Sequence, residues 1–178
     1  MANFDAFFAT LLGFEGGFVN DPADPGGATN KGITLRTFNT CANQLLGIQP
    51  TLDNLKALTN EQAGRIYKAL YWDKVKGDQI DQQELANIVF DFYVNAGANA
   101  TKLLQSVLND LGATPPLSVD GLIGPGTVQA LQRADQTELY RRYKQGRIDY
   151  YQNLAAAEPS LAKFLRGWLN RVNAFPDL

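Results

Sequence analysis

The chain has 178 residues, a hydrophobic content of 45% and a formal net charge of −2, which suits one globular domain with its own core. It contains no histidine and one cysteine, Cys41, which excludes Ser-His and Cys-His catalysis, the common zinc sites and an intramolecular disulfide. An acidic pI near 5.1 argues against nucleic-acid binding, and no apolar run approaches the roughly 18 to 20 residues that span a bilayer. Because no histidine is available to activate a nucleophile, we interpret Cys41 as a core thiol and expect carboxylates to carry any catalysis.

The first predicted helix ends in a carboxylate. Phe4, Phe8 and Leu11 recur at the spacing of one helix face, and Glu15 is the next member of that row. A carboxylate at the end of an apolar stripe should be partly desolvated. The alternative is that the helix frays at Gly13 and that Glu15 is merely solvated.

The stretch over residues 13–34 is the densest cluster of turn signals in the chain. It holds six of the sixteen glycines, and Asp21 and Asp24 each precede a proline. We expect turns or a short hairpin that folds back over the end of the first helix. General acid catalysis at a glycosidic bond needs a protonated carboxylic acid in an apolar setting and usually a second, ionised carboxylate. Glu15 fits the first role, and Asp24 or Asp21 fits the second.

The remainder of the chain predicts helices joined by turns. Capping residues, glycines and helical periodicity place them at about 34–46, 59–72, 83–95, 99–111, from 127, 137–156 and 160–174. No alternation of apolar and polar residues lasts more than a few positions. The predicted fold is therefore mainly α, with a small β-hairpin or loop wing after the first helix.

Three further residues are candidate ligand contacts. Tyr71 and Trp72 end a predicted helix, where aromatic rings can stack on sugars, although a core role is the more common one. Asp91 and Asn95 lie four residues apart on an otherwise apolar helix, so each either satisfies buried groups or lines a binding site. We assign a structural role to Asp91 and a substrate-binding role to Asn95, because Gly97 ends the helix beside it.

Residues 15–34 read EGGFVNDPADPGGATNKGIT and closely resemble the signature of glycoside hydrolase family 108, the N-acetylmuramidases of phage endolysins and so-called secretion activator proteins. The resemblance continues in order through residues 66–73, 90–95, 119–125 and 167–172, and so covers nearly the whole chain. Phe18 stands where many members have tyrosine, so an essential hydroxyl is not expected there.

This resemblance implies a lysozyme-like helical fold and cleavage of the β-1,4 bond between N-acetylmuramic acid and N-acetylglucosamine. Residues 1–178 would form a single compact domain, with a catalytic part at 1–96 and a helical, peptidoglycan-binding-like part at 97–178. The family's catalytic glutamate falls on Glu15. Phage-type lysozymes, more distantly similar, place an Asp about nine residues later and then a Thr, which favours Asp24 over Asp21 and points to Thr29.

The resulting hypothesis is a peptidoglycan hydrolase, a lysozyme, in which Glu15 protonates the leaving oxygen while Asp24 and Thr29 stabilise charge or position water. Thr34 competes with Thr29 for the water, and Asp21 is kept as a substrate-binding residue. A lytic transglycosylase, a chitinase and a non-catalytic wall-binding module remain alternatives.

The expected partner is the glycan strand of peptidoglycan, bound by a monomer. Asp21 and Asp24 lack the ligand spacing of a calcium loop, so no metal or cofactor is expected. The N-terminus lacks the basic region of a signal peptide. We therefore expect synthesis in the bacterial cytoplasm and action at the cell wall after release, as for a phage or prophage endolysin.

Overall fold

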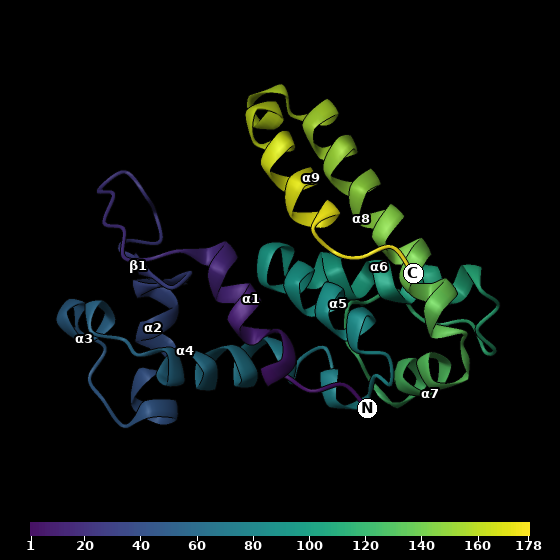
Figure 1. Ribbon diagram of the computed structural model, residues 1–178, viewed down its shortest axis with the longest axis horizontal. Helices are drawn as coiled ribbons and strands as arrows, with labels where there is room; N and C mark the ends of the chain where they lie inside the picture. The colour runs from purple at the N-terminus through teal and green to yellow at the C-terminus, as the bar shows by residue number, and fades with distance from the viewer. The chain divides into compact units, whose positions relative to one another are not determined.

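Nine α-helices and one two-stranded antiparallel hairpin make up most of the computed structural model, which describes residues 1–178 (Figure 1). The predicted mainly α fold with a small hairpin after the first helix is confirmed. The chain divides into two units, one of residues Phe4–Trp72 and one of Asp73–Leu178 together with Met1–Asn3. None of the helices combines the length and the apolar character needed to cross a membrane.

The first unit contains four α-helices and the hairpin. In chain order its elements are α1 (Asp5–Glu15), β1 (Thr29–Asn30), β2 (Ile33–Thr34), α2 (Leu35–Cys41), the π-helix η1 (Ala42–Leu46), α3 (Leu52–Lys56), α4 (Asn60–Tyr67) and the π-helix η2 (Lys68–Trp72). Local signals explain their bounds. The Thr34 hydroxyl accepts from the Thr37 amide to cap α2, and Thr59 and Gln62 form the predicted capping box of α4. Gly47, in the left-handed conformation, ends η1 as predicted.

An aromatic cluster holds α1 against α4 and η2. The Phe4 ring stacks on Phe8 at a centroid distance of 5.0 Å and meets Trp72 edge-on at 5.8 Å, while Phe8 lies 5.8 Å from Tyr67. The two helices approach closely because α4 has a glycine at the contact: a Cβ on Gly64 would lie 3.1 Å from the Phe8 ring. This packing fixes the direction in which α1 delivers its last residue, Glu15.

The hairpin is short but well anchored. Thr29 pairs with Thr34 and Asn30 with Ile33, and the connecting residues Lys31 and Gly32 both have positive φ, 52° and 78°. The buried Asn30 amide donates to the carbonyl oxygens of Leu55 at 2.8 Å and Lys56 at 3.2 Å, at the end of α3. A hairpin of this length gains its stability from such contacts rather than from its own ladder.

The regular elements of the second unit are all helices. Its elements are η3 (Gly77–Gln79, a 3₁₀ turn), α5 (Gln83–Ala96), α6 (Ala98–Asp110), α7 (Pro125–Arg133), α8 (Gln136–Ala157), the 3₁₀ helix η4 (Pro159–Phe164) and α9 (Leu165–Asn173). Every residue of α5 from Leu85 to Phe92 is buried, so α5 is the central helix of this unit, as its apolar sequence predicts. Helices α8 and α9 lie side by side as a hairpin (Figure 1).

A buried ion-pair network joins three of these helices. Asp91 of α5 is completely buried and accepts from Arg147 of α8 at 2.7 Å and from Arg171 of α9 at 2.7 Å. The Arg147 guanidinium also lies 4.9 Å from the centre of the Phe92 ring. The structural role predicted for Asp91 is confirmed.

Candidate active site

Glu15 is the last residue of α1 and is half-buried. Gly16, with φ of 78°, ends the helix directly after it, and its amide donates to Leu12 at 3.2 Å. The helix therefore does not fray at Gly13, and Glu15 continues the face that carries buried Phe7 and Leu11. The carboxylate thus stands at the boundary between the packed face and solvent, where an acid can reach a bound ligand.

The turn of the β-hairpin lies against the Glu15 side chain. A Cβ added to Gly32 would lie 2.8 Å from Oε2 and 2.9 Å from Cβ of Glu15, and 2.5 Å from the hydroxyl of Tyr67. The Tyr67 hydroxyl donates to the carbonyl oxygen of Lys31 at 2.7 Å, in the same turn. Glu15, Tyr67 and the turn therefore form one packed group.

Tyr67 is the residue of this group that sequence reasoning missed as part of the site. Its position on the inward face of α4 predicts a core residue, and it is indeed 1% exposed. A buried tyrosine hydroxyl requires a hydrogen-bond partner, and that requirement is the signal that could have directed attention to it.

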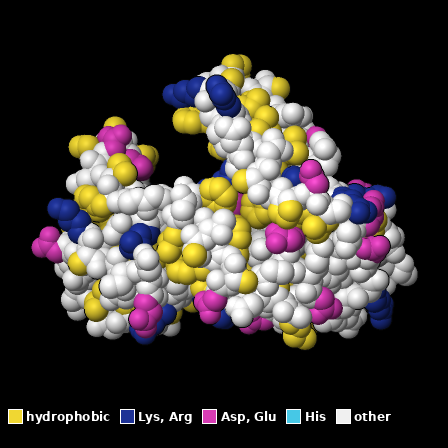
Figure 2. Space-filling view, viewed as in Figure 1, with side chains coloured by type: hydrophobic (Ala, Val, Ile, Leu, Met, Phe, Trp, Pro, Cys, Tyr) yellow, Lys and Arg dark blue, Asp and Glu magenta, His cyan; other side chains and the backbone are white.

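The chain just before the Asp21–Asp24 loop pairs with the first strand of the hairpin. Val19 pairs with Thr29 through two backbone hydrogen bonds, of 2.8 and 2.7 Å. Residues 20–28 therefore form a loop that leaves and returns at neighbouring points. Its two aspartates are exposed, and Figure 2 shows acidic side chains at the tip of this loop.

Asp21 and Asp24 have the same local structure. The Oδ1 atom of Asp21 accepts from the Ala23 amide at 2.9 Å, and that of Asp24 accepts from the Gly26 amide at 2.8 Å. Each carboxylate uses one oxygen to hold a turn. The loop is also tied to α2, because Arg36 donates to the carbonyl oxygen of Pro25 at 2.6 Å.

Asp24 and the two candidate threonines lie on or beside the hairpin. Thr29 and Thr34 are directly opposite each other in the antiparallel pair, so their side chains project from the same face. A Cβ on Gly26 would lie 3.1 Å from Cγ2 of Thr34 and 3.3 Å from Oδ1 of Asp24, so Gly26 separates these two side chains. The Thr34 hydroxyl already caps α2, which favours Thr29 for contact with water or substrate.

The two aromatic candidates differ in exposure. Trp72 is completely buried and packs edge-on against Phe4, so neither ring face can stack on a sugar. The substrate-binding prediction for Trp72 is therefore wrong, and the core role prevails. Tyr71 is half-buried, with its ring centre 5.4 Å from that of Tyr67, and it stays a candidate.

Asn95 lies in the second unit. It is exposed near the end of α5, where Gly97 terminates the helix as predicted, and its amide donates to the Tyr151 hydroxyl at 3.3 Å. Its predicted contact with substrate stays a prediction. Cys41 is a buried core thiol, as expected, and burial raises its pKa, which keeps the thiol protonated and unreactive.

Two family models together cover nearly the whole chain. The model described as glycosyl hydrolase 108 matches residues 8–97, and the model described as predicted peptidoglycan domain matches residues 99–173. The first match includes Glu15, both aspartates of the loop and the complete hairpin.

Among solved structures, the chain is similar to SagA of Brucella abortus. The two are 31% identical, the match covers 97% of this chain and 90% of that chain, and the TM-score is 0.76. No curated protein matches the chain. The matches agree with the resemblance carried by residues 15–34, and the chain therefore belongs to glycosyl hydrolase family 108, as a glycoside hydrolase with a C-terminal predicted peptidoglycan-binding domain.

Proposed function

We propose that this peptidoglycan hydrolase is a lysozyme that cleaves the β-1,4 bond between N-acetylmuramic acid and N-acetylglucosamine, with Glu15 as the general acid. The observation that carries the proposal is the packing of the Glu15 side chain against the turn at Gly32. This contact holds the carboxyl group in one place at the end of a rigid helix, and fixed placement is a large part of acid catalysis.

The proposed reaction divides the work among three side chains. Glu15 transfers its proton to the glycosidic oxygen as the bond to the anomeric carbon breaks. The ionised Asp24 stabilises the positive charge that develops on the sugar ring, using the oxygen not committed to the Gly26 amide. A water molecule held by Thr29 adds to the anomeric carbon and loses its proton to a carboxylate.

Digestion of purified sacculi by the Glu15→Gln variant tests the acid. Glutamine keeps the size of the side chain but cannot donate a proton of comparable acidity, so the rate should fall by about 10²- to 10⁴-fold. The matched control is Glu61→Gln, which removes an exposed carboxylate of the same unit that pairs only with Arg65. Substantial digestion by a folded Glu15→Gln variant contradicts the proposal.

Product analysis separates hydrolysis from the competing reactions. Mass spectrometry should find reducing N-acetylmuramic acid ends, whereas a lytic transglycosylase leaves 1,6-anhydro ends. Release of products from chitin would support a chitinase, and sedimentation with sacculi without any product would support a wall-binding module.

The place of action belongs to the same proposal. We infer that the protein works on the wall of a bacterium and serves as an endolysin. Induced expression should lower culture turbidity only after the inner membrane has been permeabilised, and the Glu15→Gln variant should not lower it at all.

A further inference from the structure

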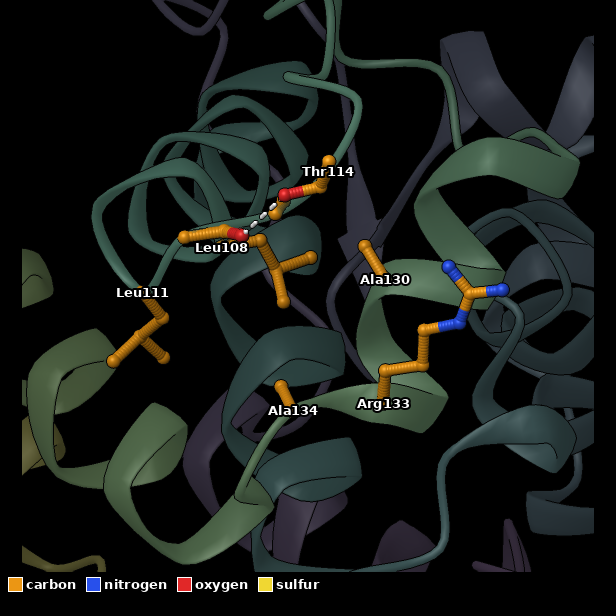
Figure 3. Close-up of a pocket in the computed structure, with 8 residues that line it drawn as sticks. Leu108, Leu111, Thr114, Ala130, Arg133 and Ala134 are labelled. Atoms are coloured by element: carbon orange, nitrogen blue, oxygen red, sulfur yellow. Dashed lines mark hydrogen bonds between the residues drawn. The ribbon is translucent and has the colours of Figure 1, made fainter.

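A small cavity of about 230 Å³ lies between the end of α6 and α7. Its wall is polar and apolar in nearly equal parts, and Arg133 is the one charged residue that lines it. Figure 3 shows the residues that define it: Leu108, Leu111, Thr114, Ala130, Arg133 and Ala134. The Thr114 hydroxyl donates to the carbonyl oxygen of Gly112 at 3.1 Å, which fixes one side of the opening. The cavity is smaller than the roughly 300–1,000 Å³ typical of sites for drug-sized ligands, so it suits one or two small residues.

Arg133 is exposed and has no hydrogen bond or ion pair in the structure. Arg166 is the other arginine without a hydrogen bond or ion pair. The rest make an ion pair or a hydrogen bond within the chain; they are Arg36, Arg65, Arg141, Arg142, Arg147 and Arg171. The position of Arg133 in the last turn of α7 gives it a weak interaction with the helix dipole. That interaction does not explain why the charged side chain lines a cavity together with Leu108, Leu111 and Ala130.

The chemistry of peptidoglycan selects an occupant for this cavity. The carboxyl group of muramic acid is consumed in the amide bond to the stem peptide, so the free carboxylates of the polymer are on the peptide and not on the sugars. The stem peptide is rich in alanine, and its terminal alanine places one methyl group next to one carboxylate. A small cavity with apolar side chains on one part of its wall and a single guanidinium on another complements that pair of groups.

We propose that this cavity binds the carboxyl-terminal alanine of the stem peptide, with its methyl group against Leu108 and Ala130 and its carboxylate on Arg133. The inference rests on the proposed function for its substrate. It adds a peptide-reading site within the predicted peptidoglycan domain, which spans residues 99–173. The enzyme would then recognise the peptide with α7 and the glycan with the hairpin.

The test is an NMR titration with a synthetic stem pentapeptide, performed in the Glu15→Gln background. The peptide with a free terminal carboxylate should shift resonances of α7 and of residues 108–114, and the same peptide with a terminal amide should bind more weakly. Arg133→Gln should weaken binding about two- to fivefold, the range of an exposed ion pair. Arg166→Gln removes the same charge from the same domain and should leave the affinity unchanged.

A second variant tests the apolar part of the cavity. Ala130→Leu adds three carbon atoms where the methyl group should lie and keeps a good helix former, so α7 should stay folded and the peptide should no longer bind. Equal binding of acid and amide, or equal losses in Arg133→Gln and Arg166→Gln, overturns the inference.

These outcomes are separable from those of the proposed function. If the wild-type protein digests sacculi but does not bind the peptide selectively, the peptide site is refuted and the lysozyme proposal stands. If it binds the peptide selectively but does not digest sacculi, the lysozyme proposal is refuted and the peptide site stands.

Discussion

The backbone of Gly32 lies directly against the side chain of Glu15, at a distance that leaves no room for a Cβ atom. Gly32 also has φ of 78°, a conformation that costs other residues about 1 to 2 kcal/mol. Gly32→Ala should therefore destabilise the hairpin and displace the Glu15 carboxyl, lowering the rate of sacculus digestion more than tenfold. Thermal melting and turbidity assays measure the two effects.

Gly17→Ala is the matched control, because a Cβ at Gly17 would have no atom within 4 Å. It should leave the rate nearly unchanged. Equal rates in the two variants would show that the contact between the turn and Glu15 is unimportant for catalysis.

Exchange of each loop aspartate for asparagine identifies the second carboxylate. Asparagine retains the Oδ1 acceptor that holds each turn, so the loop should stay folded while one negative charge is lost. We expect Asp24→Asn to lower the rate at least tenfold and Asp21→Asn to have a small effect. The reverse order, measured on the same sacculi, would transfer the role to Asp21.

Substitutions at Thr29 and Thr34 should have different effects, one on catalytic rate and the other on stability. Thr34→Val removes the cap of α2 and should cost about 1 kcal/mol of unfolding free energy. Thr29→Val keeps the shape and removes only the hydroxyl, so it should lower the rate with little change in the urea midpoint. A rate loss in Thr34→Val larger than that in Thr29→Val would assign the water to Thr34.

Removal of the Asp91 carboxylate should destabilise the second unit strongly. Asp91→Ala leaves Arg147 fully buried without a partner carboxylate, and breaking such a pair costs about 3 to 5 kcal/mol. Arg147→Met should cost less, because Arg171 still pairs with Asp91 and two buried nitrogens of Arg147 already lack partners. Chemical denaturation of both variants measures the difference.

Tyr140 should make the protein sensitive to alkali. Burial, together with the charges of Glu84 and Asp177, raises its pKa to about 12, so the folded state favours the neutral phenol. Its stabilising contribution is complete below pH 10 and is lost as the pH rises toward 12, by up to about 2 to 3 kcal/mol. Tyr140→Phe should lose less stability over that interval. An identical pH profile in wild type and variant contradicts this assignment.

Local chemistry made most of the helices predictable, with the exception of the five-residue helix α3, whose cap at Thr51 was not recognised in the sequence. Threonine caps, a capping box and Gly47 mark helix ends through contacts within a few residues, and those bounds agree with the structure. The end of α1 at Glu15 followed from the row of Phe4, Phe8 and Leu11 and from the glycine that comes next. These features require no knowledge of the tertiary fold.

The periodicity of the sequence does not predict contacts between segments that are far apart in the chain. The approach of Gly32 to Glu15 depends on the path of the whole loop, and the part played by Tyr67 depends on α4 packing beside that turn. Trp72 shows the same limit, because an aromatic ring at a helix end has the same pattern whether it faces sugar or core. Its complete burial became visible only with Phe4 in place.

The network around Asp91 also determines when the second unit can assemble. Arg147 follows Asp91 by 56 residues and Arg171 follows it by 80. On the ribosome, the Phe4–Trp72 segment is made early and can fold while synthesis continues. The nascent α5, in contrast, carries an unpaired acid in its most apolar stretch until α8 supplies Arg147, and it gains its second partner, Arg171, only when α9 has emerged. Chaperones that shield exposed apolar helices would therefore meet this protein late in translation, after Glu15 has reached its place at the end of α1.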